Sequence, residues 1–447
     1  MLQIHRRMIR VVLKPKRDES LRRFHPWVFS GAIAQIQGSP AEGDLVAVYS
    51  AEGDQLAIGH YQIGSIAVRV LSFDADPTSP DFYTVMISRA LAARTAVGLY
   101  NADGSGCPGE TVSTLGHVRG GTASEAQRWD EREARSFAGQ TAVSSNETTC
   151  FRLIHGEGDG LPGLIIDYYD GVCVMQAHSV GMFRAKNQIC DALRTVFGPA
   201  LKAVYDKSSG TAPFKAGLDL VDGYLWKADG FDSPALAVSE NGNKFLVNWV
   251  EGQKTGFFLD QRDNRALVGK YARGRNVLNL FCYTGGFSIY ALNNGALHVD
   301  SVDSSAKAMD LVQKNLELNG ISQDRYTNYC TDAIEFLGKS EEGKYDLMIV
   351  DPPAFAKHRG ALNNALRAYQ RLNAAAISRV APGGLVFTFS CSQVVDKITF
   401  AEVVFSAAAQ TGRSVRIIDR LCQGSDHPVS IYHPEGEYLK GLLLYVE

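Results

Sequence analysis

A cysteine and an aspartate follow two apolar runs in the last quarter of the 447-residue chain. The run 385–389 is rich in branched and aromatic residues and follows a Pro-Gly-Gly turn, which predicts a buried strand with Cys391 just past its end. The run 345–350 likewise ends in Asp351. Free cysteine is often only a buried packing residue. A thiol just past the carboxyl end of a strand can instead act as a nucleophile.

Cys391 and Asp351 have the residue types needed to methylate carbon 5 of a pyrimidine. That carbon is a poor nucleophile, and a thiolate that adds to carbon 6 activates it by creating an enamine. A neighbouring acid that hydrogen-bonds the base offsets the charge that develops. Cys391 and Asp351 are therefore the predicted catalytic residues.

The residues that follow Asp351 support a second chemistry. In "DPPAF", Pro352 and Pro353 offer carbonyl groups but no N–H, and Phe355 can stack on a base. Acceptors of this kind suit the exocyclic amino group of a nucleobase, whose nitrogen can be methylated without a thiol. Under this alternative Cys391 is structural, and a Cys391→Ala variant stays active.

A glycine turn and an acidic residue predict a nucleoside cofactor. The turn in "LNLFCYTGGFS" departs from GxGxxG, which argues against a dinucleotide pyrophosphate. Asp303 ends the next predicted strand, where a carboxylate can bind both hydroxyls of a ribose. These features fit S-adenosylmethionine, with Asp332 and Ala333 beside the adenine. The predicted cofactor-binding residues are Phe281, Thr284, Gly285, Gly286, Asp303, Asp332, Ala333 and Asp351.

Strands and helices alternate from residue 276 onward, which predicts a parallel, doubly wound sheet. The last two strands have no helix between them, so the final one is expected to run antiparallel. Ligands bind at the carboxyl ends of such strands, and the sheet would bring the residues above to one cleft. The predicted strands are 276–281, 298–303, 325–330, 345–351 and 384–390, followed by two near 414–421 and 439–446.

The sequence of the first half of the chain predicts several smaller structural units. Residues 10–75 are typical of a compact, barrel-like sheet of short strands, and 81–100 have helical spacing. Residues 101–149 predict a long surface insertion, and 150–235 return to alternating strands and helices. In the segment "GEGDGLPG" glycine turns are favoured over a metal site at His155, Glu157 and Asp159, so no metal is predicted.

Composition and charge narrow the class of protein. A hydrophobic content of 45% is ordinary for a globular protein, and no apolar run is long enough to span a membrane. Eight cysteines without a CxxC pair favour a reducing cytoplasm. Net charge is −3, yet residues 1–23 carry eight Lys and Arg against two acids. Arg10 and Lys14 in this cluster could contact RNA phosphates; the alternative is a solvated tail.

A polar stretch, 240–265, precedes the first strand of the predicted parallel sheet. Its clustered polar residues could wrap over the bound cofactor, or the stretch could cap the sheet edge. They are Lys254, Thr255, Gly256, Asp260, Gln261 and Arg262. The sequence leaves both interpretations open. The predicted substrate and RNA contacts are Lys254, Arg262, Pro352, Phe355, Arg10 and Lys14.

These motifs together resemble the bacterial PUA-domain-containing class I methyltransferases that make 5-methylcytosine in 23S ribosomal RNA. The resemblance rests on "RLIHGEGDGLPGLIIDYYDG", "GQKTGFFLDQRDNR", "VLNLFCYTGGFSIYA", "DPPAF" and "FTFSCS". It implies a PUA-like RNA-binding domain at 9–76, a helix with an insertion at 77–149, a central α/β domain at 150–236 and a Rossmann-like methyltransferase domain at 237–447. It also implies that Cys391 attacks cytosine.

The resemblance further implies 23S rRNA as the partner, a cytoplasmic location, no membrane association, and a homodimer as a candidate assembly. Three features depart from the family. Pro353 stands where many RNA cytosine-5 methyltransferases have a second cysteine, the insertion at 101–149 is longer than usual, and the segment 204–218 carries fewer arginines. Two rivals remain: an amino-nitrogen methyltransferase, and an RNA-binding or ribosome-assembly protein that binds the cofactor without turnover.

Overall fold

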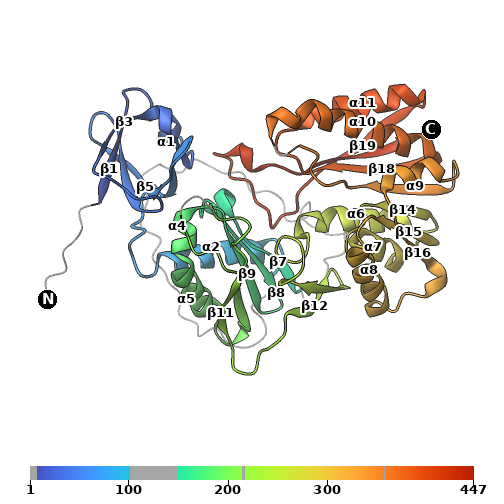
Figure 1. Cartoon of the computed structure of the whole chain (residues 1–447), viewed down its shortest axis with the longest axis horizontal. Helices are drawn as coiled ribbons and strands as arrows, with labels where there is room; N and C mark the ends of the chain where they lie inside the picture. Colours follow the sequence, from blue (N-terminus) through green and yellow to red (C-terminus); the bar gives the residue numbers. More distant parts are fainter. Residues whose placement is uncertain (1–7, 101–147, 214–216, 357) are drawn as a thin grey trace, which may run out of the picture.

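The structure is a computed structural model that describes residues 8–100, 148–213, 217–356 and 358–447. Three lobes follow one another along the chain, and each is built on its own β-sheet (Figure 1). This mixed α/β architecture confirms the predicted fold class. The predicted insertion falls almost entirely outside the described residues.

The N-terminal lobe is a six-stranded sheet with the order β2-β6-β5-β4-β1-β3. Alternating apolar residues such as Val11, Val46, Val48 and Val68 are fully buried and form its core. Its elements are β1 (Ile9–Leu13), α1 (Glu19–Arg22), β2 (Trp27–Phe29), β3 (Ile33–Gln37), β4 (Leu45–Tyr49), β5 (Gln55–Tyr61) and β6 (Ile66–Ser72).

The central lobe is a five-stranded sheet with the order β11-β10-β9-β8-β7. The predicted helix at 81–100 is α2, which packs against β7 and α5 of this lobe. Its residues Phe82 and Ile87 share a core with Leu153 and Leu193. The elements are α2 (Phe82–Ala96), β7 (Cys150–His155), β8 (Leu164–Tyr169), β9 (Val172–Ala177), α4 (Val180–Arg184), α5 (Lys186–Phe197), β10 (Ala203–Asp206) and β11 (Gly223–Lys227).

The C-terminal lobe contains a β12–β13 hairpin and a seven-stranded sheet with the order β16-β15-β14-β17-β18-β20-β19. Strands β14 to β18 are parallel, whereas β20 runs antiparallel to both β18 and β19, as predicted.

The elements of this lobe are β12 (Ala235–Glu240), β13 (Asn243–Asn248), α6 (Arg262–Ala272), β14 (Asn276–Leu280), α7 (Gly286–Asn293), β15 (His298–Asp303), α8 (Ala306–Leu318), β16 (Tyr326–Cys330), α9 (Ala333–Lys339), β17 (Tyr345–Val350), α10 (Leu362–Arg379), β18 (Val380–Ser390), α11 (Lys397–Thr411), β19 (Val415–Cys422) and β20 (Lys440–Val446). Strand order reverses between β14 and β17, and ligand crevices form at such a switch point.

None of the helices in the described parts of the chain has both the length and the apolar character needed to cross a bilayer.

The connection between β19 and β20 joins the C-terminal lobe to the other two. In Figure 1 this red segment projects toward the N-terminal and central lobes. Asp426 in this connection is fully buried and accepts hydrogen bonds from the Arg152 N–H at 2.9 Å and from Arg262 Nη2 at 2.8 Å, while its carbonyl accepts from Arg94 Nη2 at 2.9 Å. A buried carboxylate between arginines of two lobes restricts how those lobes can move.

Candidate active site

A cavity of about 360 Å³ lies at the carboxyl ends of the parallel strands of the C-terminal lobe. It receives residues that follow β14, β15, β17 and β18, together with the segment before α6. The topology brings these side chains together because parallel strands all end at the same edge of the sheet. The predicted site residues that line this cavity are Lys254, Phe281, Thr284, Gly286, Asp303, Asp351, Pro352 and Cys391.

Asp351 is partly exposed in this cavity, and Gln261 Nε2 donates a hydrogen bond to its Oδ2 at 3.0 Å. Burial and the nearby Asp260 raise the pKa of Asp351 to about 7. Burial acts on Asp260 in the same direction, but Lys254 and other polar neighbours outweigh it and hold the pKa of Asp260 at about 2. At neutral pH Asp260 is therefore ionised, whereas a substantial fraction of Asp351 is protonated.

Cys391 follows β18 directly and is partly exposed. Burial and Asp351 raise the pKa of its thiol to about 11, and Lys254 acts in the opposite direction. The thiol is therefore mostly protonated, and nucleophilic use of Cys391 requires groups that stabilise the thiolate.

The turn after β14 has an unusual backbone. Phe281 and Tyr283 have positive φ angles of 57° and 47°, a region that non-glycine residues rarely adopt. The turn is held by Asp303, whose Oδ2 accepts from the Tyr283 N–H and whose Oδ1 accepts from the Ser305 N–H, both at 3.0 Å. A Cβ at Gly286 would lie 2.9 Å from Arg265 Cδ, so only glycine fits there.

Several predicted cofactor and base contacts lie outside this cavity. Gly285 is buried at the start of α7, where its φ is 77°. Asp332 caps α9 by accepting from the N–H groups of Ile334 and Glu335, and Ala333 is buried behind it. The Phe355 ring packs on Tyr369, with centroids 4.7 Å apart.

The predicted RNA contacts Arg262, Arg10 and Lys14 also lie elsewhere. Arg262 is 1% exposed and binds Asp426 inside the protein, which leaves no face for RNA. The Arg10 guanidinium lies 3.9 Å from the centre of the Tyr49 ring, and Lys14 Nζ donates to the carbonyl of Gly31 at 2.9 Å. Of the four predicted basic contacts, all of which the structure describes, Lys254 alone lines the cavity.

A second, larger groove of about 940 Å³ meets the active-site cavity at Lys254. All three lobes line it: Trp27 and Arg69 come from the first, and Lys207 comes from the second. The C-terminal lobe adds Gln393, two residues after Cys391. A ligand in this groove can therefore reach the active-site cavity.

The groove carries cations and neutral imidazoles. Lys207 Nζ donates to the carbonyls of Trp249 and Gly252 at 2.5 and 2.6 Å. Burial and Arg152 lower the pKa of His155 to about 2 and that of His178 to about 4, so both rings are neutral. Glu157 accepts from Arg69 and Trp27, and Asp159 from Arg94, so these carboxylates bind cations of the protein.

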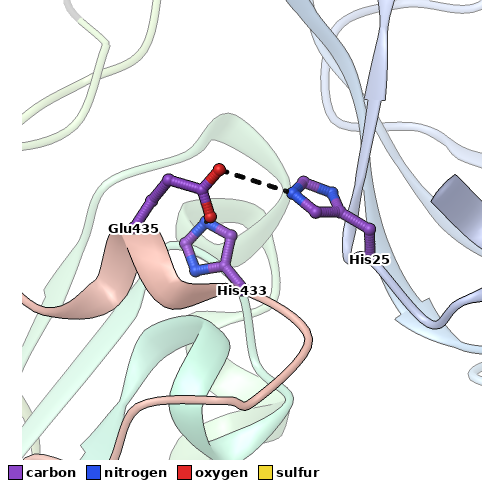
Figure 2. Close-up of side chains that lie close together, drawn as sticks. All are labelled: His25, His433 and Glu435. Atoms are coloured by element: carbon purple, nitrogen blue, oxygen red, sulfur yellow. Dashed lines mark ion pairs between the residues drawn. The ribbon is translucent and has the colours of Figure 1, made fainter.

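His25, His433 and Glu435 lie close together (Figure 2), and His433 and Glu435 line this groove. His25 Nε2 lies 3.9 Å from Glu435 Oε1, and His433 Nε2 lies 3.8 Å from Glu435 Oε2. His25 Nδ1 accepts from the Trp27 N–H at 3.2 Å, so the neutral ring carries its proton on Nε2. A metal would need the lone pair of that atom, and the cluster does not fit a metal site.

Sequence reasoning assigned no role to Tyr283 or Arg265, although both line the active-site cavity. Asp260 and Gln261 also line it, and both belong to the polar stretch that the sequence offered as a possible cover for the cofactor. Trp27, Arg69 and Lys207 had no comparable signal, because their grouping depends on how the lobes pack.

Comparison with known proteins places this geometry in a family. Residues 226–443 match the S-adenosylmethionine-dependent methyltransferase family, and residues 11–73 match the PUA-like domain family. A protein described as a SAM-dependent methyltransferase from Streptococcus mutans shares 20% identity and a TM-score of 0.74, over 98% of this chain and 100% of its own. A methyltransferase structure complexed with SAH gives a TM-score of 0.75 at 20% identity, over 98% of this chain and 100% of its own. These likenesses show the fold.

Two curated relatives are more similar in sequence. Ribosomal RNA large subunit methyltransferase I of Shewanella amazonensis is 37% identical over 98% of this chain and 99% of its own length. The protein of that name from Alteromonas mediterranea is 38% identical over 98% of each chain. This similarity along nearly the whole length, with the methyltransferase match, confirms the predicted family, enzyme class and cofactor: the chain belongs to the ribosomal RNA large subunit methyltransferase I family and is an S-adenosylmethionine-dependent methyltransferase.

Proposed function

We propose that this enzyme methylates carbon 5 of a cytosine in 23S ribosomal RNA, with Cys391 as the nucleophile. The relatives named above act, by name, on large-subunit ribosomal RNA, which supports the substrate class. One observation carries the chemistry: the partly exposed thiol of Cys391 lines the same cavity as Asp303 and Asp351. A methyl donor and a target base that share this cavity would both lie near the thiol.

The cavity fits S-adenosylmethionine. Each Asp303 oxygen accepts one backbone hydrogen bond and keeps lone pairs for the ribose hydroxyls. Asp260 Oδ1 is buried without a hydrogen-bond partner among the described residues, and such an orphaned acceptor suits the cationic end of the cofactor. When bound, S-adenosylmethionine supplies an electrophilic methyl group. We assign Phe281, Thr284 and Gly286 to the wall of its site.

The thiolate of Cys391 adds to carbon 6 of cytosine and forms a carbon–sulfur bond, while the electron pair of the 5,6 double bond moves toward carbon 5. Carbon 5 is then nucleophilic and would take the methyl group from S-adenosylmethionine, which would leave as S-adenosylhomocysteine. Transfer of the carbon 5 proton to a base or to water returns an electron pair to the ring, which re-forms the double bond and expels the thiolate. Cys391 is thus regenerated.

Asp351 assists the addition. Because its pKa is about 7, a substantial fraction of Asp351 is protonated at neutral pH. In that form it donates a hydrogen bond to the ring nitrogen at position 3, which draws electron density away from carbon 6 as the thiolate attacks. Gln261 holds the carboxyl group in place.

The RNA reaches this cavity through the three-lobe groove. Lys207 and Lys254 offer positive charge to phosphates, and Trp27 offers an aromatic surface to a base. The target cytosine leaves its stack and enters the cavity beside Lys254, since a stacked base cannot reach a recessed thiol.

The test uses 23S RNA from a deletion strain, methylated in vitro by wild-type enzyme, by Cys391→Ala and by Cys330→Ala, and digested for nucleoside mass spectrometry. We expect 5-methylcytidine with wild type and with the Cys330 variant, and none with Cys391→Ala. Cys330 is an exposed thiol at the end of β16, which makes it a matched control.

Two outcomes would contradict the proposal. An N-methylated base made equally well by wild type and Cys391→Ala would move the chemistry to Asp351 and the amino nitrogen. Cofactor binding without methyl transfer to any RNA would favour the rival function of binding or assembly. RNA substituted with 5-fluorocytidine adds a direct readout, because a fluorine at carbon 5 cannot leave as a proton and the covalent adduct to Cys391 persists in SDS.

A further inference from the structure

Lys440 is a buried lysine on the strand next to the one that ends before Cys391. It is the first residue of β20 and pairs with Ser390, the last residue of β18, so it lies one position from Cys391 in the register of the sheet. Lys440 is only 6% exposed. Lysine is almost never this buried unless its charge is compensated.

The Lys440 ammonium binds the turn that follows Cys391. Its Nζ donates to the carbonyl oxygens of Ser392 at 2.5 Å and Val395 at 2.6 Å. The same two residues close the turn, because the Val395 N–H donates to the Ser392 carbonyl at 3.3 Å. No ion pair between Lys440 and a carboxylate is found within the described residues. Two carbonyl dipoles therefore share a full positive charge.

We propose that Lys440 is a positioning residue for Cys391: it fixes the 392–395 turn and stabilises the Cys391 thiolate with its ammonium. The inference rests on the proposed role of Cys391 as nucleophile. It explains why a cation is buried beside a thiol, and it adds to the stabilisation of the thiolate that Lys254 gives from the cavity.

The charges around both groups agree with this role. Burial lowers the pKa of Lys440 to about 8, and Cys391 opposes that shift, together with Asp396 and Glu437, whereas Lys397 adds to it. The Cys391 thiolate favours the charged form of Lys440. Because coupling between two sites is reciprocal, the Lys440 ammonium favours the thiolate form of Cys391 to the same extent. On the other side of the thiol, Asp351 and Asp260 disfavour the thiolate and Lys254 favours it. The Lys440 ammonium is present below about pH 8 and is lost above it.

The test measures the rate of Cys391 alkylation by iodoacetamide against pH in the full chain, with peptide mass spectrometry to separate the thiols. In Lys440→Met we expect alkylation of Cys391 near pH 7.5 to slow about tenfold, because the ammonium that favours the thiolate is missing; above about pH 8, where wild type also loses the ammonium, the two rates should converge. The exposed Cys330 is the internal reference and keeps its rate. Lys339→Met is the matched control, since this exposed lysine pairs with Glu335 and is not among the charges that act on Cys391 or Lys440, so its loss leaves the Cys391 profile unchanged.

Lys440→Gln separates charge from packing, because glutamine keeps two N–H donors for the turn but carries no charge. We expect the same slowing of Cys391 alkylation near pH 7.5, which keeps the test decisive if the methionine variant folds poorly. An unchanged Cys391 profile in folded Lys440→Gln overturns the inference. Failure of the proposed function is distinct: Cys391→Ala would then keep its methyltransferase activity, while the alkylation of Cys391 would still respond to Lys440.

Discussion

The two cavities that meet at Lys254 are built in different ways. The active-site cavity of about 360 Å³ is formed by strand ends of one sheet and by the segment before α6. The groove of about 940 Å³ is formed by three lobes that are separate units along the chain. A single sheet can hold reactive groups within hydrogen-bond distance of one another. A long ligand needs a surface that only the packing of several lobes creates.

The two cavities also differ in charge. The active-site cavity holds three carboxyl groups, Asp260, Asp303 and Asp351, which suits a cationic donor and a protonated acid. The groove also has three carboxylates in its lining, but four cations outnumber them: Arg69, Arg152, Lys207 and Lys254. Its His155 and His178 rings are neutral, so the groove suits phosphates and bases. Variants of one cavity should therefore leave the function of the other intact, and each prediction below tests that separation.

Asp351→Asn should have the largest effect. We expect the single-turnover methylation rate to fall about 100- to 1000-fold, because general-acid assistance is lost. The affinities for cofactor and RNA should change less than about twofold if the two cavities are independent. Rapid-quench measurement of tritium transfer gives the rate, and fluorescence titration gives both affinities. A large loss of RNA affinity in this variant would show that the two cavities do not function independently.

The same substitution should stabilise the fold at alkaline pH. The folded-state pKa of Asp351 is about 7, above its ordinary value of 3.8, so the folded protein binds this proton more tightly than the unfolded chain. Tighter binding of this proton adds to the free energy of unfolding. That contribution is fully present below about pH 4 and is lost as the pH rises to about 7. Asp351→Asn carries no charge, and we expect a gain of roughly 2 kcal/mol at pH 8 and little gain at pH 4. Urea unfolding at both pH values measures the difference.

Asp303→Ala should weaken cofactor binding next. Loss of charge-assisted hydrogen bonds to the ribose should raise the Kd for S-adenosylhomocysteine about 10- to 100-fold in calorimetry. RNA affinity should stay the same. Asp310→Ala, an exposed acid on α8, is the control and should bind the cofactor normally. A variant that loses RNA affinity in parallel would show that the turn also supports the groove.

Lys254→Ala should be the exception to the separation, because this residue lines both cavities. We expect about a tenfold loss of RNA affinity and a slower alkylation of Cys391, since the ammonium also favours the thiolate. A change in only one of these two readouts would assign Lys254 to a single cavity.

Lys207→Met should have the smallest effect. We expect RNA affinity to fall about threefold to tenfold and the salt dependence of binding to lose a slope of about one, as for a single phosphate contact. Cofactor affinity should not change. Lys202→Met in the same lobe, where the lysine pairs with Asp170, is the control. If the salt dependence of RNA binding is the same in Lys207→Met as in wild type, the proposal that RNA binds along the groove is contradicted.

The sequence was sufficient for every feature that depends on local pattern. Apolar runs with period and length typical of strands, each followed by a turn, predicted the parallel sheet and its antiparallel last strand, and the structure confirms both. Cys391, Asp351 and Asp303 could be found because a residue just past a parallel strand must lie at one edge of the sheet. The DPPAF and glycine-turn motifs needed no knowledge of other lobes.

Tertiary structure decided everything that depends on register or on contacts between distant segments. Arg262 looked like a substrate contact, yet its partner Asp426 lies far along the chain and holds it inside the protein. Lys440 is an unremarkable lysine until the pairing of β18 with β20 places it next to the strand that ends before Cys391. The pKa of Asp351 depends on burial and on Asp260, which no sequence pattern reports. Local pattern fixes which residues end a strand; long-range packing fixes their neighbours, their solvent exposure and hence their charge.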